Sequence, residues 1–223
     1  MLDRLVFINE SIKQKLSLAE NEALEILILT YPLTRASADT TNGFQQSQTP
    51  EISIDLDISL DGEGSSVLIR QASLVAGETE LSTRVSIEHN AKKCRSNLLS
   101  KCVLSDRTSK SSWQGNVLIN PGAKDTITYE ENRNLLLTQG AKAQSEPNLE
   151  IFEGDIISAG HASATGRFEY EQLFYLMSRG IDERTAKSLV VRGFLLGALA
   201  DVSITEAELE HFEQGIEAVL EEK

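Results

Sequence analysis

Apolar and polar residues alternate along the chain up to about residue 157, in short runs separated by polar turns. The clearest run is 52–60, where Ile or Leu occupies every second position and the turn residues Asp61-Gly62 follow. Successive side chains of a strand point to opposite faces, so this period of two predicts a strand with one buried face. Further strand-like runs lie at 67–69, 80–87, 98–104, 115–119, 125–129, 134–138 and 149–157.

Glycine and proline interrupt these runs at Gly115, Pro121-Gly122, Gly140, Pro147 and Gly154. We expect breaks between strands at these positions, and we expect Trp113 to pack at a turn. No repeat of fixed length is visible, so the pattern alone permits a β-sandwich, a barrel or an irregular solenoid. Residues 34–50 are polar with hardly any apolar side chains, which predicts a mobile loop between strands.

The period changes to that of a helix after Gly166. A first helical face ends at Gly180, a residue that tolerates the positive φ of a helix C-terminus. Asp182 is suited to cap a second helix over 183–199. The apolar faces of these two helices are formed by Leu173, Phe174, Leu176 and Met177, and by Ala186, Leu189, Val190, Phe194 and Leu196.

The residues Thr205-Glu-Ala-Glu208 have the spacing of a capping box, which predicts the start of a third helix. This helix places Leu209, Phe212, Ile216 and Leu220 on one face. The chain therefore divides into a β domain over residues 1–165 and a C-terminal helical domain over residues 166–223.

Composition and charge exclude several classes of function. The formal net charge of −13 opposes binding to nucleic acid, and no basic stripe with interleaved aromatic residues is present. No apolar run reaches the roughly 18 to 20 residues that cross a bilayer, and the N-terminus does not resemble a signal peptide. We therefore expect a cytoplasmic protein without membrane contact. The acidic residues concentrated in 201–223 indicate a solvated helix face or, as the alternative, an acidic docking surface.

Few residues are suited to chemistry. No phosphate-binding loop, dinucleotide-binding glycine motif, HExxH metal motif or GxSxG nucleophile motif is present, so no catalytic residue is predicted. His161 lies among small residues within 158–166, at the junction between the strands and the helices, where a metal or a partner can reach its imidazole. A purely structural junction residue is the alternative. His89 and His211 are interpreted as structural or solvated.

Two cysteines, Cys94 and Cys102, are too few for a disulfide framework, so both are predicted to be free thiols. Buried, inert thiols are the simpler interpretation. Ligation of iron or of an iron–sulfur cluster is the alternative, because thiolate sulfur suits these metals.

The stretch Glu171-Gln-Leu-Phe-Tyr-Leu-Met-Ser-Arg-Gly-Ile181 strongly resembles the C-terminal signature of the SufB/SufD family, the paired scaffold proteins of SUF iron–sulfur cluster assembly. Segments 132–137, 147–152 and 160–166 are similar to SufD segments in the same order. The resemblance is specific from about His89 to Val202. It implies a right-handed parallel β-helix followed by a small helical domain, which decides among the folds left open above.

The resemblance also implies partners. Family members pair SufB with SufD through their β-helices, and the helical domain of each docks a subunit of the ABC-type ATPase SufC. We expect this chain to pair with a SufB-like protein, or with a second copy of itself, and to dock a SufC-like ATPase. The docking residues are expected to be Leu173, Phe174, Leu176 and Phe194.

The resemblance implies a role for His161 in forming an iron–sulfur cluster, because SufD chains carry a histidine at this place of the interface. The metal would be shared with the partner, and no cofactor is expected to be bound tightly by the chain alone. Asn132 stands where SufB carries its cluster-site cysteine, and Ala159 stands where some SufD chains carry a cysteine. The SufD type is therefore favoured. The N-terminal helical region usual in the family is expected to be missing.

Two other functions stay open. One is a carrier of iron–sulfur clusters or metal that uses Cys94, Cys102 and His161 within one chain. The other is a β-solenoid enzyme that cleaves acidic polysaccharides, which would require clustered carboxylates on one face and is disfavoured.

Overall fold

The computed structural model describes residues 2–32, 51–168 and 170–221. The predicted loop 34–50 lies outside the described residues. The strands are β1 (Leu2–Ile8), β2 (Ile12–Leu18), β3 (Ala23–Thr30), β4 (Glu51–Leu60), β5 (Ser66–Val75), β6 (Glu80–His89), β7 (Arg95–Leu104), β8 (Lys110–Ile119), β9 (Ile127–Leu136), β10 (Lys142–Ile151) and β11 (Ser158–Arg167). The helices α1 (Tyr170–Ser178), α2 (Glu183–Leu196) and α3 (Glu206–Glu221) follow.

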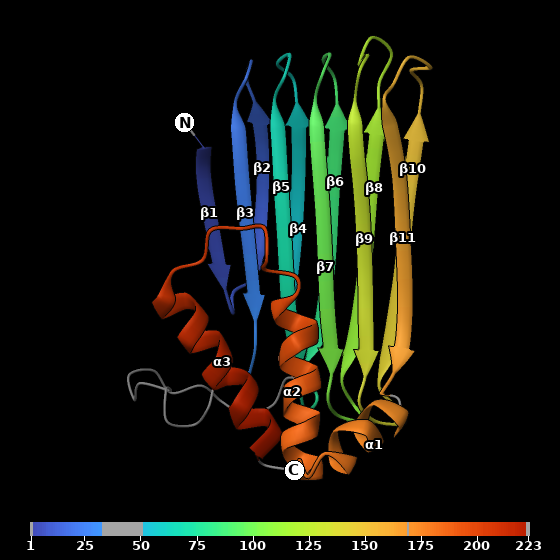
Figure 1. Ribbon diagram of the computed structural model, residues 1–223. Coiled ribbons are helices and arrows are strands. Elements are labelled where there is room, and N and C mark those ends of the chain that lie inside the picture. The colour runs from blue at the N-terminus through green and yellow to red at the C-terminus, as the bar shows by residue number, and fades with distance from the viewer. Residues whose placement is uncertain (1, 33–50, 169, 222–223) are drawn as a thin grey trace.

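The strands form two parallel sheets that lie face to face (Figure 1). The odd sheet has the order β1-β3-β5-β7-β9-β11, and the even sheet has the order β10-β8-β6-β4-β2. The chain passes from one sheet to the other after each strand and advances by one position per coil. This arrangement is a β-solenoid followed by helices, so the predicted fold class is confirmed.

The coils differ in length, which explains why no fixed repeat is visible in the sequence. In the odd sheet Ser66 pairs with Arg95, Arg95 with Ile127, and Ile127 with Ser158. Successive coils therefore add 29, 32 and 31 residues. The additional residues lie in the turns, so the strands stay in register while the sequence period drifts.

The space between the sheets holds the main hydrophobic core. The alternation in β4 places Ile54, Leu56, Ile58 and Leu60 in this interior, as predicted, and each is buried. Trp113 is also fully buried in the interior, in the middle part of β8. The expectation that Trp113 packs at a turn is therefore wrong, because β8 continues through Trp113 and Gly115 to Ile119.

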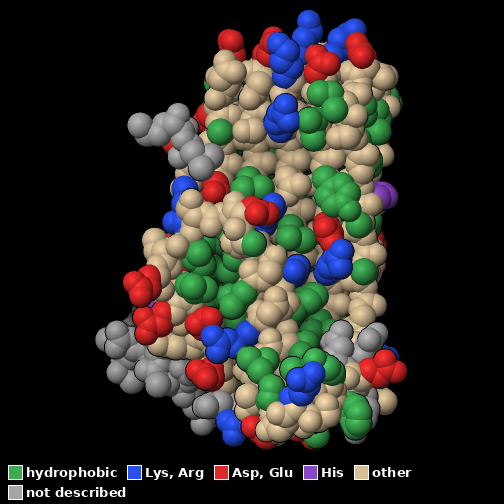
Figure 2. Space-filling model, viewed as in Figure 1, with side chains coloured by type: hydrophobic (Ala, Val, Ile, Leu, Met, Phe, Trp, Pro, Cys, Tyr) green, Lys and Arg blue, Asp and Glu red, His purple; other side chains and the backbone are tan. Residues whose placement is uncertain are grey.

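Neighbouring coils are linked at the rim where even strands lead into odd strands. Asp61 accepts a hydrogen bond from Asn90 Nδ2 at 2.7 Å, and Asn90 accepts one from Asn120 Nδ2 at 2.6 Å. An ion pair between Lys93 and Glu63 joins the first two of these coils, and one between Lys124 and Asp155 joins the third to the last coil. Figure 2 shows charged side chains gathered at this upper rim.

A second hydrophobic core lies between the outer face of the odd sheet and the helices. Figure 1 shows α2 and α3 in front of this sheet. The sheet contributes Leu27, Leu29, Ala72, Leu74 and Val103, and the helices contribute Val191, Leu195, Phe212, Ile216 and Val219. Strands and helices thus share one core, and the division into domains 1–165 and 166–223 stays a prediction. No helix within the described residues is long and apolar enough to span a bilayer.

The predicted caps of the helices are confirmed, whereas α2 ends at Leu196 and not at residue 199. Gly180 has a φ of 87°, the left-handed conformation expected after α1. Asp182 accepts a hydrogen bond from the Thr185 backbone N–H at 3.0 Å and so caps α2. At the start of α3, Thr205 Oγ1 accepts from the Glu208 N–H at 3.3 Å, and Glu208 Oε2 accepts from the Thr205 N–H at 2.8 Å. This reciprocal pair is the predicted capping box.

Several predicted strand boundaries are wrong. The runs 125–129 and 134–138 belong to one strand, β9, whose central residues are polar although they face the interior. Residues 158–167 are not a junction but the strand β11. Pro147 lies inside β10, which is the edge strand of the even sheet, and an edge strand tolerates a residue without a backbone N–H.

Candidate functional site at the open edge of the solenoid

The last coil leaves both sheets with an open edge. Strand β11 ends the odd sheet and β10 ends the even sheet, so neither pairs on its outer side with another described strand. His161 lies in β11 and pairs in register with Glu130 of β9. Its side chain is 44% exposed.

The alternation of β11 turns His161 toward the interior side of the odd sheet. Ala159, two residues earlier, packs against the interior core, so His161 faces the same way. The neighbouring side chains in β11 are small, which leaves the imidazole uncovered on its outer side. His161 therefore closes the interior at the open edge while solvent still reaches it.

Glu130 lies directly behind His161 and is buried. Its side chain is 1% exposed, and neither carboxylate oxygen has a hydrogen-bond partner. The distance from Glu130 Oε1 to His161 Nδ1 is 3.8 Å, which is too long for a hydrogen bond. Burial disfavours the charged carboxylate and raises the pKa of Glu130 to about 7.

Gly115 of β8 makes room for this carboxylate from the opposite sheet. A Cβ atom at Gly115 would lie 2.3 Å from Glu130 Oε2 and 2.4 Å from the Trp113 ring. Any side chain at this position would therefore collide with both. Gly115, which was predicted to mark a break between strands, lies inside β8 instead, and its missing side chain leaves room for the Glu130 carboxylate.

A polar network continues from the same strand into the interior. Asn132 donates to Ser100 Oγ at 3.3 Å, and Asn134 donates to Asn132 Oδ1 at 2.8 Å and to Thr165 Oγ1 at 3.2 Å. Ser145 of β10 also donates to Asn132 Oδ1, at 2.6 Å. Asn132 therefore belongs to a hydrogen-bonded network inside the solenoid.

Glu130 and this network were not predicted from the sequence. Every second residue from Thr128 to Asn134 is polar and buried, so β9 breaks the rule that inward positions are apolar. That break was the available signal, because polar residues at interior positions of a solenoid require partners. Because 125–129 and 134–138 were predicted as two separate runs, the alternation of buried positions across them was not recognised.

The cysteines do not join this site. Cys94 and Cys102 are buried free thiols. Cys94 directly precedes β7 and Cys102 lies near the end of that strand, so at about 3.3 Å per residue the extended chain separates them by roughly 26 Å. Burial raises the pKa of Cys102 to about 12, which keeps its thiol protonated. The structure therefore does not bring Cys94, Cys102 and His161 together around one ion.

The other two histidines, His89 and His211, lie on β6 and α3 and not on the strand of His161. His89 is buried at the end of β6, where its Nε2 lies 2.9 Å from Ser96 Oγ. Burial lowers its pKa to about 4. His211 is exposed on α3. These placements agree with the interpretation of His89 as structural and of His211 as solvated.

The four predicted docking residues differ in accessibility. Phe174 is 61% exposed on α1, whereas Leu173 is buried and Leu176 is half-buried. Phe194 on α2 is half-buried, with Lys101 Nζ of β7 5.3 Å from the centre of its ring. A partner at this surface would touch Phe174 directly, and the assignment of all four as docking residues stays a prediction.

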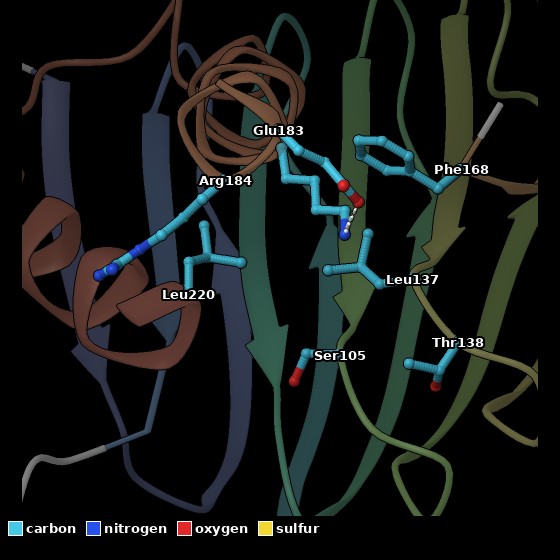
Figure 3. A pocket seen from close by; sticks show the side chains of 8 residues that line it. Ser105, Leu137, Thr138, Phe168, Glu183, Arg184 and Leu220 are labelled. Atoms are coloured by element: carbon cyan, nitrogen blue, oxygen red, sulfur yellow. Dashed lines mark ion pairs between the residues drawn. The ribbon is translucent and has the colours of Figure 1, made fainter. Parts of the chain in front are cut away.

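A pocket of about 380 Å³ lies where strands of the odd sheet end beneath the first turn of α2. Figure 3 shows its lining side chains, which come from the residues after β7, β9 and β11 and from α2 and α3. Glu183 and Lys187 form an ion pair here at 2.6 Å, so their charges compensate each other. The pocket is formed by residues other than His161 and Glu130, and we assign it no role.

The fold and the site define a class: a parallel β-solenoid with helices on one outer face, whose last coil holds an exposed imidazole beside a buried carboxylate. The family model for the SufBD core domain of SUF system iron–sulfur cluster assembly matches residues 37–194. The chain belongs to this family.

Named relatives agree with the family. An iron–sulfur cluster assembly SufBD family protein of Mycobacterium tuberculosis is 48% identical over 147 residues, which covers 63% of this chain and 37% of the relative. The cluster assembly protein SufD of Escherichia coli is 31% identical over 153 residues, or 67% of this chain and 36% of the relative. SufD of Bacillus subtilis is 34% identical over 147 residues, or 66% and 32%. The matched region spans about a third of each relative's length.

Proposed function

We propose that this chain is a non-catalytic, SufD-like scaffold subunit of SUF iron–sulfur cluster assembly. It pairs with a SufB-like protein through the open edge of the solenoid and docks a SufC-like ATPase through its helices. The nascent cluster is the substrate at the interface, where His161 contributes from this chain. Family membership and the SufD relatives support a role in SUF iron–sulfur cluster assembly. The surfaces described above support the proposed contacts with the two partners.

The open edge is the observation that carries the pairing. Unpaired strand edges readily add a further chain, and exposed apolar side chains beside them favour association. Ile151, Phe152 and Ile157 are all exposed next to β10 and β11, with Phe152 at 62%. A partner that covers these residues would also enclose His161 of the same coil. A second copy of this chain is the alternative occupant.

The helical contact is supported by a separate surface. Phe174, Tyr175 and Met177 of α1 and Leu189 of α2 are exposed although they are large and apolar. Figure 2 shows hydrophobic side chains at the lower end of the molecule, where α1 and α2 lie. An exposed apolar helix surface fits a partner's groove.

Two exposed phenylalanines offer a matched test of this proposal. The chain is co-expressed with SufB-like and SufC-like proteins, and the mass of the purified complex is measured. We expect Phe152→Asp to release the SufB-like subunit, because it places a charge in the strand-edge contact, and to leave ATPase binding to this chain intact. We expect Phe174→Asp to release the ATPase and keep the pairing.

Each variant is the control for the other, since the two side chains are 62% and 61% exposed. A wild-type chain that purifies alone contradicts the scaffold function. Loss of both partners in both variants contradicts the assignment of separate surfaces.

The carrier function is disfavoured by the distance between the cysteines. A carrier that used Cys94, Cys102 and His161 together would require two buried thiols that lie roughly 26 Å apart along the extended chain to reach one ion.

A further inference from the structure

We propose that the last coil of the solenoid, residues 142–167, opens from the rest of the isolated chain and becomes ordered when a partner covers it. The coil consists of β10, β11 and the turn between them. The inference rests on the proposed function only for the identity of the partner, because the opening is a property of this chain alone.

The last coil has no buried core of its own. The structure describes all of its residues, and each of them is exposed or half-buried. Four apolar side chains, none of them fully buried, join it to the main core: Ala143, Leu149, Ile156 and Ala159. In the preceding coil, by contrast, every second residue of β8 from Ser111 and of β9 from Thr128 is buried. Because buried apolar area is the main source of stability, the last coil is the least stable coil of the three at this end.

The polar contact that holds the last coil is imperfect. Asn134 Nδ2 of β9 lies 3.0 Å from Ser145 Oγ of β10, 3.2 Å from Thr165 Oγ1 of β11 and 2.8 Å from Asn132 Oδ1. An amide nitrogen carries two hydrogens, so it cannot give full hydrogen bonds to three acceptors. Thr165 is also exposed, so water competes for its hydroxyl. This contact therefore stabilises the closed coil only weakly.

The closed coil also covers polar atoms that have no partner. Both carboxylate oxygens of Glu130 and the Oδ1 atom of Asn134 are buried without a hydrogen bond. Both residues point inward from β9, where they pair in register with His161 and Thr165 of the last coil. A buried polar group without a partner is costly, and opening the coil lets water reach all three atoms. The hydration of these atoms favours the open form.

The other end of the solenoid lacks these features. Ile12 and Leu18 of β2 are buried, and Arg4 of β1 pairs with Glu208 of α3 at 2.7 Å. The last coil is instead fixed at its two ends, by Ala141 in the main core and by Phe168 against the second core. Opening is therefore confined to residues 142–167. It is a local equilibrium of the folded chain, below the free energy of global unfolding.

The test is hydrogen exchange of the isolated, untagged chain, resolved to single amides by NMR spectroscopy. The outward amides of an edge strand are unpaired and exchange quickly in any case, so the relevant amides are those of β10 and β11 that bond to β8 and β9. We expect these amides to exchange at least about 100-fold faster than the bonded amides of β5 to β7. Equal exchange rates in the two groups overturn the inference.

A matched pair of variants tests the cause. Glu130→Met replaces the unpartnered carboxylate by an apolar side chain of similar length, and we expect the same amides to exchange about tenfold more slowly. Glu131→Met is the control, because Glu131 is the next residue of β9 but points to the outer face, where it pairs with Arg133. This variant should keep the wild-type exchange within about twofold. Equal exchange in the wild type and Glu130→Met contradicts the role of the unpartnered atoms.

The complex with a SufB-like protein tests the second half of the inference. We expect the partner to slow the exchange of these amides about tenfold or more, and a stable complex in which they exchange as in the isolated chain overturns the ordering by the partner. Failure to form any complex contradicts the proposed function instead, because the opening is measured on the isolated chain.

Discussion

His89 and Glu130 are ionisable side chains within the solenoid interior, and burial moves their pKa values in opposite directions. Burial disfavours the charged form of each, so the pKa of His89 falls to about 4 and that of Glu130 rises to about 7. Below pH 6.5 the unfolded chain protonates His89 more readily than the folded chain does. Above pH 4.5 the unfolded chain releases the Glu130 proton more readily. The two residues therefore destabilise the fold at opposite ends of the pH range.

We predict that His89 lowers the free energy of unfolding as the pH falls from 6.5 to 4. The unfolded histidine gains its proton near 6.5, whereas the folded one does so only near 4, a difference of roughly 3 kcal/mol. His89→Gln cannot be protonated, so its unfolding free energy should fall less steeply over this range. Denaturant unfolding at pH 7, 5.5 and 4.5 measures this. His211→Gln, at an exposed position, should keep the wild-type pH dependence, and a His89→Gln variant that also keeps it contradicts the prediction.

Predictions for single residues were accurate where the alternation of apolar and polar residues, or the residue type itself, determines burial. Apolar positions of 52–60 and the structural interpretation of His89 agree with the structure. Glu130 could not be found in this way, because its significance comes from Gly115 and His161, which lie on two other strands. Only the pairing of the coils brings these three residues together.

At the scale of elements, helix ends were predictable because the interactions that fix them are local. The Asp182 cap and the Thr205–Glu208 capping box involve residues three apart in sequence. Strand ends were less predictable. Strands β9 and β11 show no alternation of apolar and polar residues, because the interior residues of β9 are polar and the residues of β11 are small. Pairing with neighbouring coils identifies these segments as strands.

We predict that Thr205→Ala destabilises the protein by about 1 kcal/mol, the usual effect of losing an N-terminal cap. The hydroxyl accepts the Glu208 N–H, and the Glu208 carboxylate in turn pairs with Arg4 of β1 at 2.7 Å. Losing the cap therefore also loosens a contact between α3 and the odd sheet. Denaturant unfolding measures the change. Thr205→Ser keeps the hydroxyl and should remain within a few tenths of a kcal/mol of the wild type, whereas equal effects of Ala and Ser would exclude the cap as the cause.

At the scale of the whole molecule, the packing of the helices on the solenoid was not predictable from periodicity. The helical faces were identified, but their pattern does not say what covers them. The structure places the outer face of the odd sheet against α2 and α3, with Phe212 packed edge-to-face on Tyr31 at 5.6 Å between ring centres. The solenoid itself was inferred from family resemblance. The length of its coils varies between 29 and 32 residues, so no repeat of fixed length is visible in the sequence.

This shared core predicts that strands and helices unfold together. Phe212 is fully buried between them, so Phe212→Ala should cost about 3 to 5 kcal/mol. Helical and β signals in circular dichroism should then shift to the same lower denaturant concentration. Phe174→Ala, at an exposed position, should change stability by less than about 0.5 kcal/mol. If Phe212→Ala instead unfolds the helices while the strands keep their wild-type transition, residues 1–165 and 166–223 fold as independent domains. A single shifted transition means that the strands and the helices unfold as one cooperative unit. This unit then includes both proposed contact surfaces, the helices for the ATPase and the open edge for the SufB-like partner.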